Sequence, residues 1–524
     1  MQPDGRPDQP RHRTARRPVR RAQREERRSD HEGHRDMKKH APRLSEQSHD
    51  IQGMLKSGFG SLTTSRFRLL TIRNAKLARA WLAALLDTGL IVSAEQVGRP
   101  KQAKKEKEKK EKKHVDSVVA IGFTYSGLLE LGCRETSEHP FPTPFRSGMG
   151  SELRAKLLRD EYRQWSWTDR EGPGGGEVVH ILLAEWRGRG VVSRLPPINS
   201  GAFSVIEAGE DSDFFDGDGK LSEPFGFRDG LAQPVIRGLR DQDGESLAQA
   251  RADAAGFYDD RLVEPGEFIL GYRNEYDELT FCPDVQGWAG ASGRFTQNGS
   301  YLAVRQFEQD VAAFKAFEAA HSDFETANGV SAGEKLMGRR KNGLPLSWKG
   351  DTSVPVSDSA ADAFRYRVED ADGFMCPKGA HVRRSNPRDS LGIDVQSSIK
   401  SSKLHRLLRR GRPYREASGR QGIFFIACNA DLERQFEFIH QRWLQNRRFG
   451  TLESQDDPIV GSQPCPKAFT IPGQASGSEV SLQHFTQTLG GGYFFLPGIA
   501  ALKFIAENRG SAKSGSTHLN IVAG

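Results

Sequence analysis

Apolar positions along the chain follow the two periods that distinguish strands from helices. Strand-like apolar runs stand at 66–72, 117–124, 177–186, 266–272 and 423–429. After the first run, a helix is predicted over 74–86, because Leu77, Trp81, Ala84 and Leu85 recur there at helical spacing. A shorter helix is predicted at 125–132, after the second run. Strands and helices therefore alternate through the first half of the chain.

The second half repeats this pattern. Residues 300–314 pass from a strand into a helix, and residues 491–505 do the same. After the run at 423–429, a helix over 431–444 would place Leu432, Phe436, Ile439 and Trp443 on one face. We therefore predict two α+β halves, each a sheet covered by helices on one face. The polar region 321–372 shows little periodicity and is predicted to be a long loop.

Two segments differ from the rest in composition. Residues 1–48 are rich in Arg, Pro, Asp and His and nearly lack large apolar side chains, so we predict a disordered basic tail. A Lys/Glu-rich insertion at about 99–114 is predicted to be exposed. The remaining chain divides into an N-terminal domain at 49–255 and a C-terminal domain at 256–524.

Charge argues against a nucleic-acid partner. The chain carries a formal net charge of +8, but residues 1–40 contribute +6 and residues 101–113 contribute +5. The rest of the chain is therefore close to −3, and the basic charge belongs to the two appended segments. There is also no apolar run long enough to cross a membrane, so we expect no membrane partner.

Cysteine usage points to a reducing environment. The five cysteines are scattered and form no CxxC pair, which argues against a disulfide framework or a zinc site. On this basis the cytoplasm is the predicted compartment.

Three short segments carry candidate chemistry. The stretch GFMCPKGAHVRRSNPR at 373–388 holds one histidine, His381, between turn-forming residues. The others are GFRDG at 226–230, with Asp229 between two glycines, and LLRRGRPY at 407–414. Taken singly, each has an ordinary structural interpretation: an exposed histidine, an Asp-Gly turn and solvated arginines.

In this order and spelling, the three segments resemble the dye-decolorizing peroxidase (DyP-type) family of haem enzymes. The family's GxxDG motif stands at 226–230, and its Cys-Pro-x-Gly-Ala-His segment followed by Asn-Pro-Arg stands at 376–388. Its distal arginine matches Arg409, two residues before Gly411. The resemblance runs from about Ile51 to the YFFLPG segment at 493–498 and leaves out the Lys/Glu insertion.

The resemblance implies a fold of two ferredoxin-like domains, with one haem b bound mainly in the C-terminal half. It implies that His381 ligates the iron and that its other ring nitrogen donates to Asp457, with Asp456 as the alternative. Asp229 would act as general base and then general acid toward hydrogen peroxide. Arg409 would stabilise the developing negative charge.

Further expectations follow from these roles. Ile423 and Phe425 share one strand face and would line the distal pocket, although ordinary core packing explains them equally well. Hydrogen peroxide and dyes, phenols or other aromatic electron donors are the expected substrates. Because the unperturbed pKa of Asp is about 3.9, activity is expected to peak at acidic pH. Trp443 and Tyr414 are candidates for passing electrons from large donors at the surface.

Three alternatives stay open at this point. Cys376 or Cys465, each followed by proline, would offer a thiolate in place of His381 as the haem ligand. A haem carrier with little turnover would need His381 but not the pair of Asp229 and Arg409. An interaction scaffold without a cofactor would need none of them.

Overall fold

The computed structural model describes residues 43–97, 116–172, 175–211, 214–215, 220–239, 261–290, 293–322, 329–351, 361–472 and 478–507. The described residues from Leu44 onward belong to one compact unit, which contains every element below. The insertion at 99–114 lies outside the described residues, as does the tail up to residue 42. The tail prediction extends too far, because helix α2 forms at Leu44–Gln47 and buries Leu44.

The first half builds a four-stranded antiparallel sheet. Its strands are β1 (Thr64–Ile72), β2 (Ser117–Phe123), β5 (Ile181–Arg187) and β6 (Phe203–Asp211), in the order β6-β1-β5-β2. Helix α3 (Ala75–Asp87) crosses from β1 to β2, and β5 pairs between these two strands. This split β-α-β arrangement is the ferredoxin-like order.

The second half repeats that order. Its strands are β9 (Ser300–Gln309), β11 (Arg412–Arg415), β12 (Gln421–Asn429) and β15 (Thr486–Leu496), paired antiparallel as β11-β12-β9-β15. Helix α8 (Val311–Ala320) follows β9, and two π-helical segments, η5 (Glu433–Glu437) and η6 (Ile439–Leu444), follow β12. The predicted α+β fold with two ferredoxin-like sheets is therefore confirmed. The predicted boundary at 255/256 falls outside the described residues and stays a prediction.

The two sheets join into a ring of eight strands. One seam pairs Phe123 of β2 with Phe495 of β15, and the other pairs Glu210 of β6 with Arg415 of β11. Alternate residues of every strand point into the ring, where they form a buried apolar core that includes Phe67, Trp186 and Phe424. The remaining strand residues face outward.

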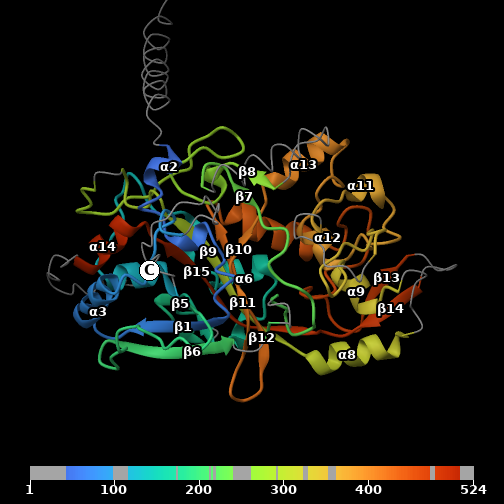
Figure 1. Ribbon diagram of the computed structural model, residues 1–524, viewed down its shortest axis with the longest axis horizontal. Coiled ribbons are helices and arrows are strands. Elements are labelled where there is room, and N and C mark those ends of the chain that lie inside the picture. The colour runs from blue at the N-terminus through green and yellow to red at the C-terminus, as the bar shows by residue number, and fades with distance from the viewer. Residues whose placement is uncertain are drawn as a thin grey trace, which may run out of the picture. The chain divides into compact units, whose positions relative to one another are not determined.

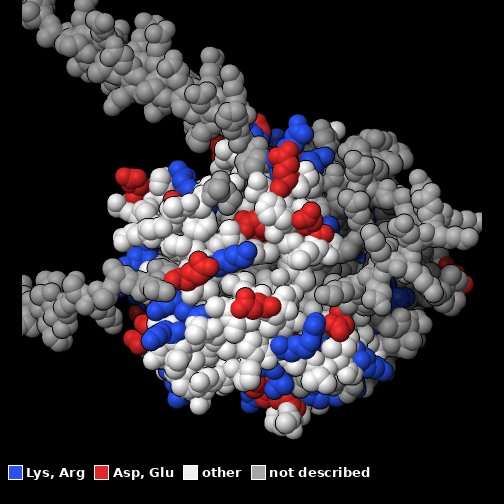
Figure 2. Space-filling model, turned by 60° about the vertical axis from the view of Figure 1, so that its left-hand side comes forward, with Lys and Arg blue, Asp and Glu red and all other residues white. Residues whose placement is uncertain are grey.

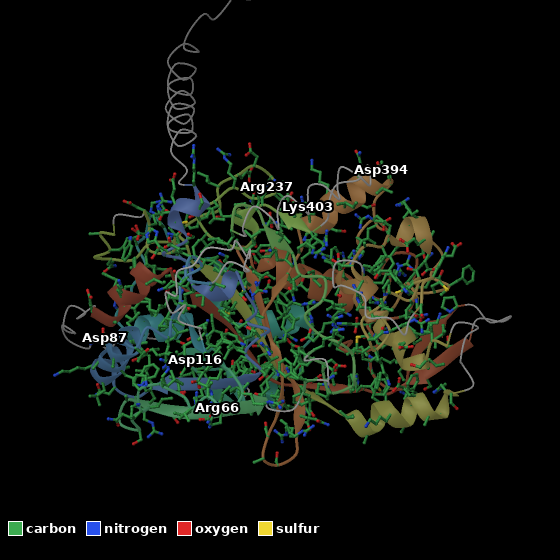
Figure 3. All side chains as sticks on the ribbon, viewed as in Figure 1. Arg66, Asp87, Asp116, Arg237, Asp394 and Lys403 are labelled. Carbon is green, nitrogen blue, oxygen red and sulfur yellow. The ribbon has the colours of Figure 1, made fainter. Side chains whose placement is uncertain are left out.

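Helices cover this outward face. Helix α3 and the C-terminal helix α14 (Ile499–Glu507) pack side by side over part of it (Figure 1). The segments after β9 and β12 lie on another side, with α9 (Ala332–Met337), α11 (Tyr366–Glu369), α12 (His381–Ser385) and α13 (Val395–Lys403). Asp394 caps the start of α13, and Lys403 at its end pairs with Glu275 at 3.0 Å (Figure 3).

Shorter elements complete the described part of the chain. The remaining strands are β3 (Trp167–Thr168), β4 (Glu177–Val178), β7 (Val235–Ile236), β8 (Leu262–Val263), β10 (Leu408–Arg409), β13 (Lys467–Ile471) and β14 (Ser478–Leu482). The remaining helices are η1 (Gly53–Leu55), α4 (Tyr125–Glu130), α5 (Thr143–Ser147), α6 (Glu152–Leu158), η2 (Tyr162–Gln164) and η3 (Pro265–Glu267).

Some local predictions are wrong. The predicted strand at 266–272 is a 3-10 turn and irregular chain instead, because the backbone folds back on itself and the Gly266 N–H donates to the Arg273 carbonyl at 2.8 Å. Leu77 is 41% exposed, and α3 buries Ala78 and Leu82 beside Trp81 and Leu85. The region 321–372 contains helices α9 and α11 within its described part.

The face seen in Figure 2 is consistent with the small net charge predicted for the folded part of the chain. Lys and Arg residues are mixed with Asp and Glu residues over the face seen in Figure 2, and neither sign forms a continuous patch there. None of the described helices is long and apolar enough to span a membrane.

Candidate active site

The three candidate segments meet at one cavity of about 660 Å³ on the outward face of β9 and β12. Asp229, His381 and Arg409 line it, and so do Ile423 and Phe425. These residues are spread over nearly two hundred positions of the chain. The fold therefore brings together the side chains that the sequence singled out.

His381 enters the cavity from the first position of α12. Its Nδ1 atom hydrogen-bonds to both carboxylate oxygens of Asp457, at 3.1 and 3.0 Å. This bond fixes the ring orientation and leaves Nε2 as the nitrogen that can act as a ligand toward the cavity. His381 thus has the environment of a metal-ligating imidazole.

Asp457 is fully buried and held as a carboxylate. Burial on its own raises the pKa of Asp457, but the adjoining His381 and the Val460 N–H hold that pKa at about 2. Its Oδ1 atom accepts from the Ile459 and Val460 N–H groups at 2.9 Å each. Asp456 instead accepts from the Gln463 N–H at 2.7 Å, so Asp457 is the partner of His381.

Asp229 lies on a turn that depends on its two glycines. Gly226 and Gly230 have φ values of +95° and +79°, a region closed to most side chains. The Asp229 N–H donates to the Leu221 carbonyl at 2.8 Å, and the Gly230 N–H donates to Asp229 Oδ1 at 2.6 Å. The carboxylate is thereby fixed at the cavity wall.

Arg409 and Arg410 have different surroundings. Arg409 donates from Nη2 to the Leu231 carbonyl at 2.6 Å, next to the Asp229 turn. Arg410 donates to the Met54 and Leu55 carbonyls and ties the N-terminal segment to β10. Of the two, Arg409 is the arginine that accompanies Asp229.

Ile423 and Phe425 stand on β12 directly opposite Phe307 and Arg305 of β9. The intervening Phe424 points into the ring core. Because the pair belongs to the opposite face of the strand, it lines the cavity and is not ordinary ring-core packing. Whether the pair lines a haem pocket stays a prediction.

Sequence reasoning missed several cavity residues. Glu223, three residues before Gly226, is buried there, as are Gln309 and Arg305 of β9. Arg305 pairs with Asp160, with Nη1 at 2.9 Å from Oδ1. The proximity of Glu223 to the GFRDG motif was the one available signal.

Trp443 and Tyr414 are both buried. Trp443 lines the cavity and packs against His405 and Phe438, while Tyr414 lies in the core of the ring. The expectation that either one passes electrons at the surface is therefore not supported by its exposure.

The residues present fit a haem group. The cavity volume lies within the range of about 300–1,000 Å³ usual for ligand sites, and His381 supplies one nitrogen ligand. Asn386 Oδ1 in the cavity wall is a buried acceptor with no hydrogen-bond partner among the described residues. No cluster of three or more His, Cys, Asp or Glu suited to a free metal ion occurs in the part of the chain that the structure describes.

The charge of the wall suits the carboxylates of haem. Two carboxylates, Glu223 and Asp229, line the cavity. The cations that line it are more numerous: Lys220, Arg228, Arg305, Arg339, Arg340, Arg406, Arg409, Arg410 and Arg412. This excess of positive charge favours an anionic ligand.

The cysteines do not offer a ligand to this cavity. Cys376 is buried away from it, and burial raises the pKa of its thiol to about 12. Cys465 is exposed and does not line the cavity either. The geometry therefore favours imidazole over thiolate ligation.

Comparison with known proteins finds similarity to dye-decolorizing peroxidases. Residues 271–463 match the family model described as the C-terminal part of Dyp-type peroxidases. Curated relatives include a dye-decolorizing peroxidase from Auricularia auricula-judae, 28% identical over 314 residues that cover 53% of this chain and 55% of that protein. Another is a dye-decolorizing peroxidase from Mycetinis scorodonius, 26% identical over 431 residues, which cover 74% and 76% of the two chains.

Over the matched residues the chain is thus similar to dye-decolorizing peroxidases. The part matched by the DyP family model contains His381, Arg409 and Asp457, whereas Asp229 lies before it. A solved DyP-type peroxidase from Anabaena sp. superposes with a TM-score of 0.68 at 21% identity, covering 88% of this chain and 95% of that one. This likeness shows the fold. The chain spans about half the length of the Auricularia DyP.

Proposed function

We propose that this chain is a haem b peroxidase with one haem per chain. It would reduce hydrogen peroxide while oxidising dyes, phenols or other aromatic electron donors. The observation that carries the proposal is the convergence of Asp229 and Arg409 with His381 on one cavity. The names of the related proteins add support for dyes as substrates.

Each residue has a definite task in this proposal. His381 would hold the iron through Nε2, while Asp457 keeps the proton on Nδ1 and would add anionic character to that ligand. Asp229 takes a proton from hydrogen peroxide on one of its carboxylate oxygens and returns it to the departing oxygen. Arg409 stabilises the negative charge that develops between these two transfers.

Haem bound there would supply the iron centre that takes two oxidising equivalents from peroxide and passes them to the reductant. Ile423 and Phe425 line the same cavity as Asp229 and Arg409. They would exclude bulky donors from direct contact with the reacting oxygen atoms.

A haem carrier is the less favoured alternative. A carrier needs His381 and the cationic wall, but it has no use for an acid–base group beside an arginine. Because Arg409 is bonded to the turn that carries Asp229, the site supports peroxide turnover more than haem transport. We also propose a cytoplasmic location, because all five cysteines are free.

The test compares haem-loaded wild type with His381→Ala by visible spectroscopy, before and after one equivalent of hydrogen peroxide. We expect the wild-type spectrum to show imidazole-ligated haem, to change on peroxide addition and to recover when a dye is oxidised. The variant should lose the ligand signature and the response. Haem that binds to the wild type but ignores peroxide would favour the carrier, and failure to bind haem would exclude both functions.

A further inference from the structure

Glu223 is a second carboxyl group on the wall that carries Asp229. It is 7% exposed and lines the same cavity. Its Oε1 accepts from the Phe227 N–H at 2.9 Å, and its Oε2 accepts from the Phe225 N–H at 3.1 Å. These two donors lie on either side of Gly226, so the Glu223 carboxylate stabilises the turn through both of its oxygens.

The same carboxylate ties the turn to the sheet. Gln309, near the end of β9, donates from Nε2 to Glu223 Oε2 at 2.6 Å. Phe225 and Phe227 on the turn pack against Phe314 of α8, the helix that follows β9. Glu223 thus joins the turn that carries Asp229 to the end of β9.

The surroundings of Glu223 favour uptake of a proton. Burial, opposed by the three hydrogen bonds and reinforced by the nearby charge of Asp229, raises the pKa of Glu223 to about 7. Other charged groups on this part of the wall are Lys220 and Arg228 from the same loop, Arg305 from β9, Arg340 after α9, and Arg409 from β10. Lys341, whose carbonyl accepts from the Arg228 N–H, pairs with Glu318 at 2.8 Å.

The Gln309 amide can hydrogen-bond Glu223 in both the charged and the protonated form of that carboxyl group. Its Oε1 is a buried acceptor without a hydrogen-bond partner among the described residues, while its Nε2 serves the carboxylate. If Glu223 takes up a proton on Oε2, a half-turn of the Gln309 amide presents Oε1 to the new O–H. The contact then persists with donor and acceptor exchanged, and only a proton from the cavity has been added.

We propose that Glu223 is a positioning residue that takes up and releases a proton while bonded to Gln309, so that Asp229 faces a neutral neighbour when Glu223 is protonated and a charged one when it is not. The effect expected on turnover, described below, rests on the proposed peroxidase function. Repulsion between two carboxylates makes ionised Asp229 less favourable once Glu223 is charged, and it strains the turn that both share. Peroxide turnover should therefore decline as Glu223 loses its proton.

Infrared titration of the haem-free protein tests the proton exchange. We compare wild type with Glu223→Gln, Asp229→Asn and the control Glu437→Gln. Glu437 is a buried glutamate bonded to Tyr493 and Arg154 that does not line the cavity. The wild type should show a protonated-carboxyl band that disappears near pH 7, is absent in Glu223→Gln and is retained in Glu437→Gln. In Asp229→Asn the band should disappear at lower pH.

The haem-loaded proteins test the consequence for turnover. The alkaline decline of wild-type activity that accompanies loss of the Glu223 proton should be absent in Glu223→Gln, while the decline in Glu437→Gln should match wild type. A titrating band that survives Glu223→Gln, or an unshifted band in Asp229→Asn, would overturn the proposal. So would an alkaline decline that is the same in wild type and Glu223→Gln. Loss of peroxide turnover in all the proteins would count against the peroxidase, with the infrared titration still deciding the role of Glu223.

Discussion

Arg409 donates from Nη2 to the main-chain carbonyl of Leu231 at 2.6 Å. Leu231 follows Asp229 by two residues, so the arginine is bonded to the very turn that carries the carboxylate. The two groups assigned to proton transfer and charge stabilisation are therefore fixed relative to each other by the backbone. A change at position 409 removes a cation and also loosens the turn.

Arg409→Lys should lower the rate of the peroxide step by about 10²–10³-fold, the cost of losing one preorganised donor. Lysine keeps the charge but cannot reach Leu231 and the reacting oxygen with one planar group. Stopped-flow mixing with peroxide measures the rate. Arg410→Lys is the matched control: it should lower the melting temperature through Met54 and Leu55 and leave the peroxide step intact. Equal rates for both variants would remove Arg409 from its role.

Asp229→Asn should lower peroxide turnover by about 10²–10⁴-fold, because the amide cannot carry the proton. Haem affinity should stay close to wild type, since Asp229 does not touch His381. Steady-state assays and haem titration measure the two quantities. Asp116→Asn, at an exposed residue paired with Arg194 (Figure 3), is the control for a lost surface charge. Wild-type turnover in Asp229→Asn would show that the proton goes elsewhere.

Asp457→Asn should weaken haem binding or turnover by about 10–100-fold, as is usual when the partner of a ligating histidine is lost. The neutral amide no longer adds anionic character to His381, so the reduction potential of bound haem should rise. Potentiometric titration measures the direction. Asp456→Asn, which changes the neighbouring carboxylate bonded to Gln463 N–H, should leave the potential near wild type.

Glu223 should make the folded protein less stable as pH rises. Its folded-state pKa of about 7 lies above the ordinary value of 4.5, so the folded state binds the proton more tightly. The stabilisation is complete below pH 4.5 and is lost as pH rises through 7, and it amounts to roughly 3 kcal/mol. Denaturant unfolding at pH 5 and pH 8 measures this loss. In Glu223→Gln this part of the pH dependence should vanish, and an unchanged slope would contradict the assignment.

Phe425→Ala should widen the cavity beside Arg305 and Phe436, which Phe425 now contacts or faces. We expect faster oxidation of bulky dyes and little change for small phenols, because only the large donors are excluded by size. The ratio of the two turnover numbers is the readout. Phe424→Ala, one residue away but inside the ring, should instead destabilise the protein by about 3–5 kcal/mol.

The sequence identified part of the cavity wall and missed the rest. Asp229, His381 and Arg409 were singled out because their three short segments together resemble the DyP-type family, and their roles stay a proposal. Glu223 was not, since a glutamate in a loop is usually solvated, and its burial depends on β9 and Gln309, which are distant in sequence. Arg305 looked like an ordinary polar position of a strand, and only pairing with Asp160 explains its burial.

The secondary structure shows the same limit. Strand and helix periods identified six of the eight strands of the ring. They missed β11, which has four residues, and β6, whose apolar pattern is weak. They failed at 266–272, where an apolar run forms a turn because Gly266 lets the backbone approach Arg273 closely. Tertiary packing also decided which face of α3 is buried, which placed Leu77 outside.

The ring of strands has an implication for synthesis of the chain. Strand β15, at residues 486–496, supplies partners to both β9 and β2. Until the ribosome has delivered it, those two strands keep open edges, and open edges recruit strands from other chains. Aggregation of the nascent protein competes with folding until β15 emerges and pairs with both strands.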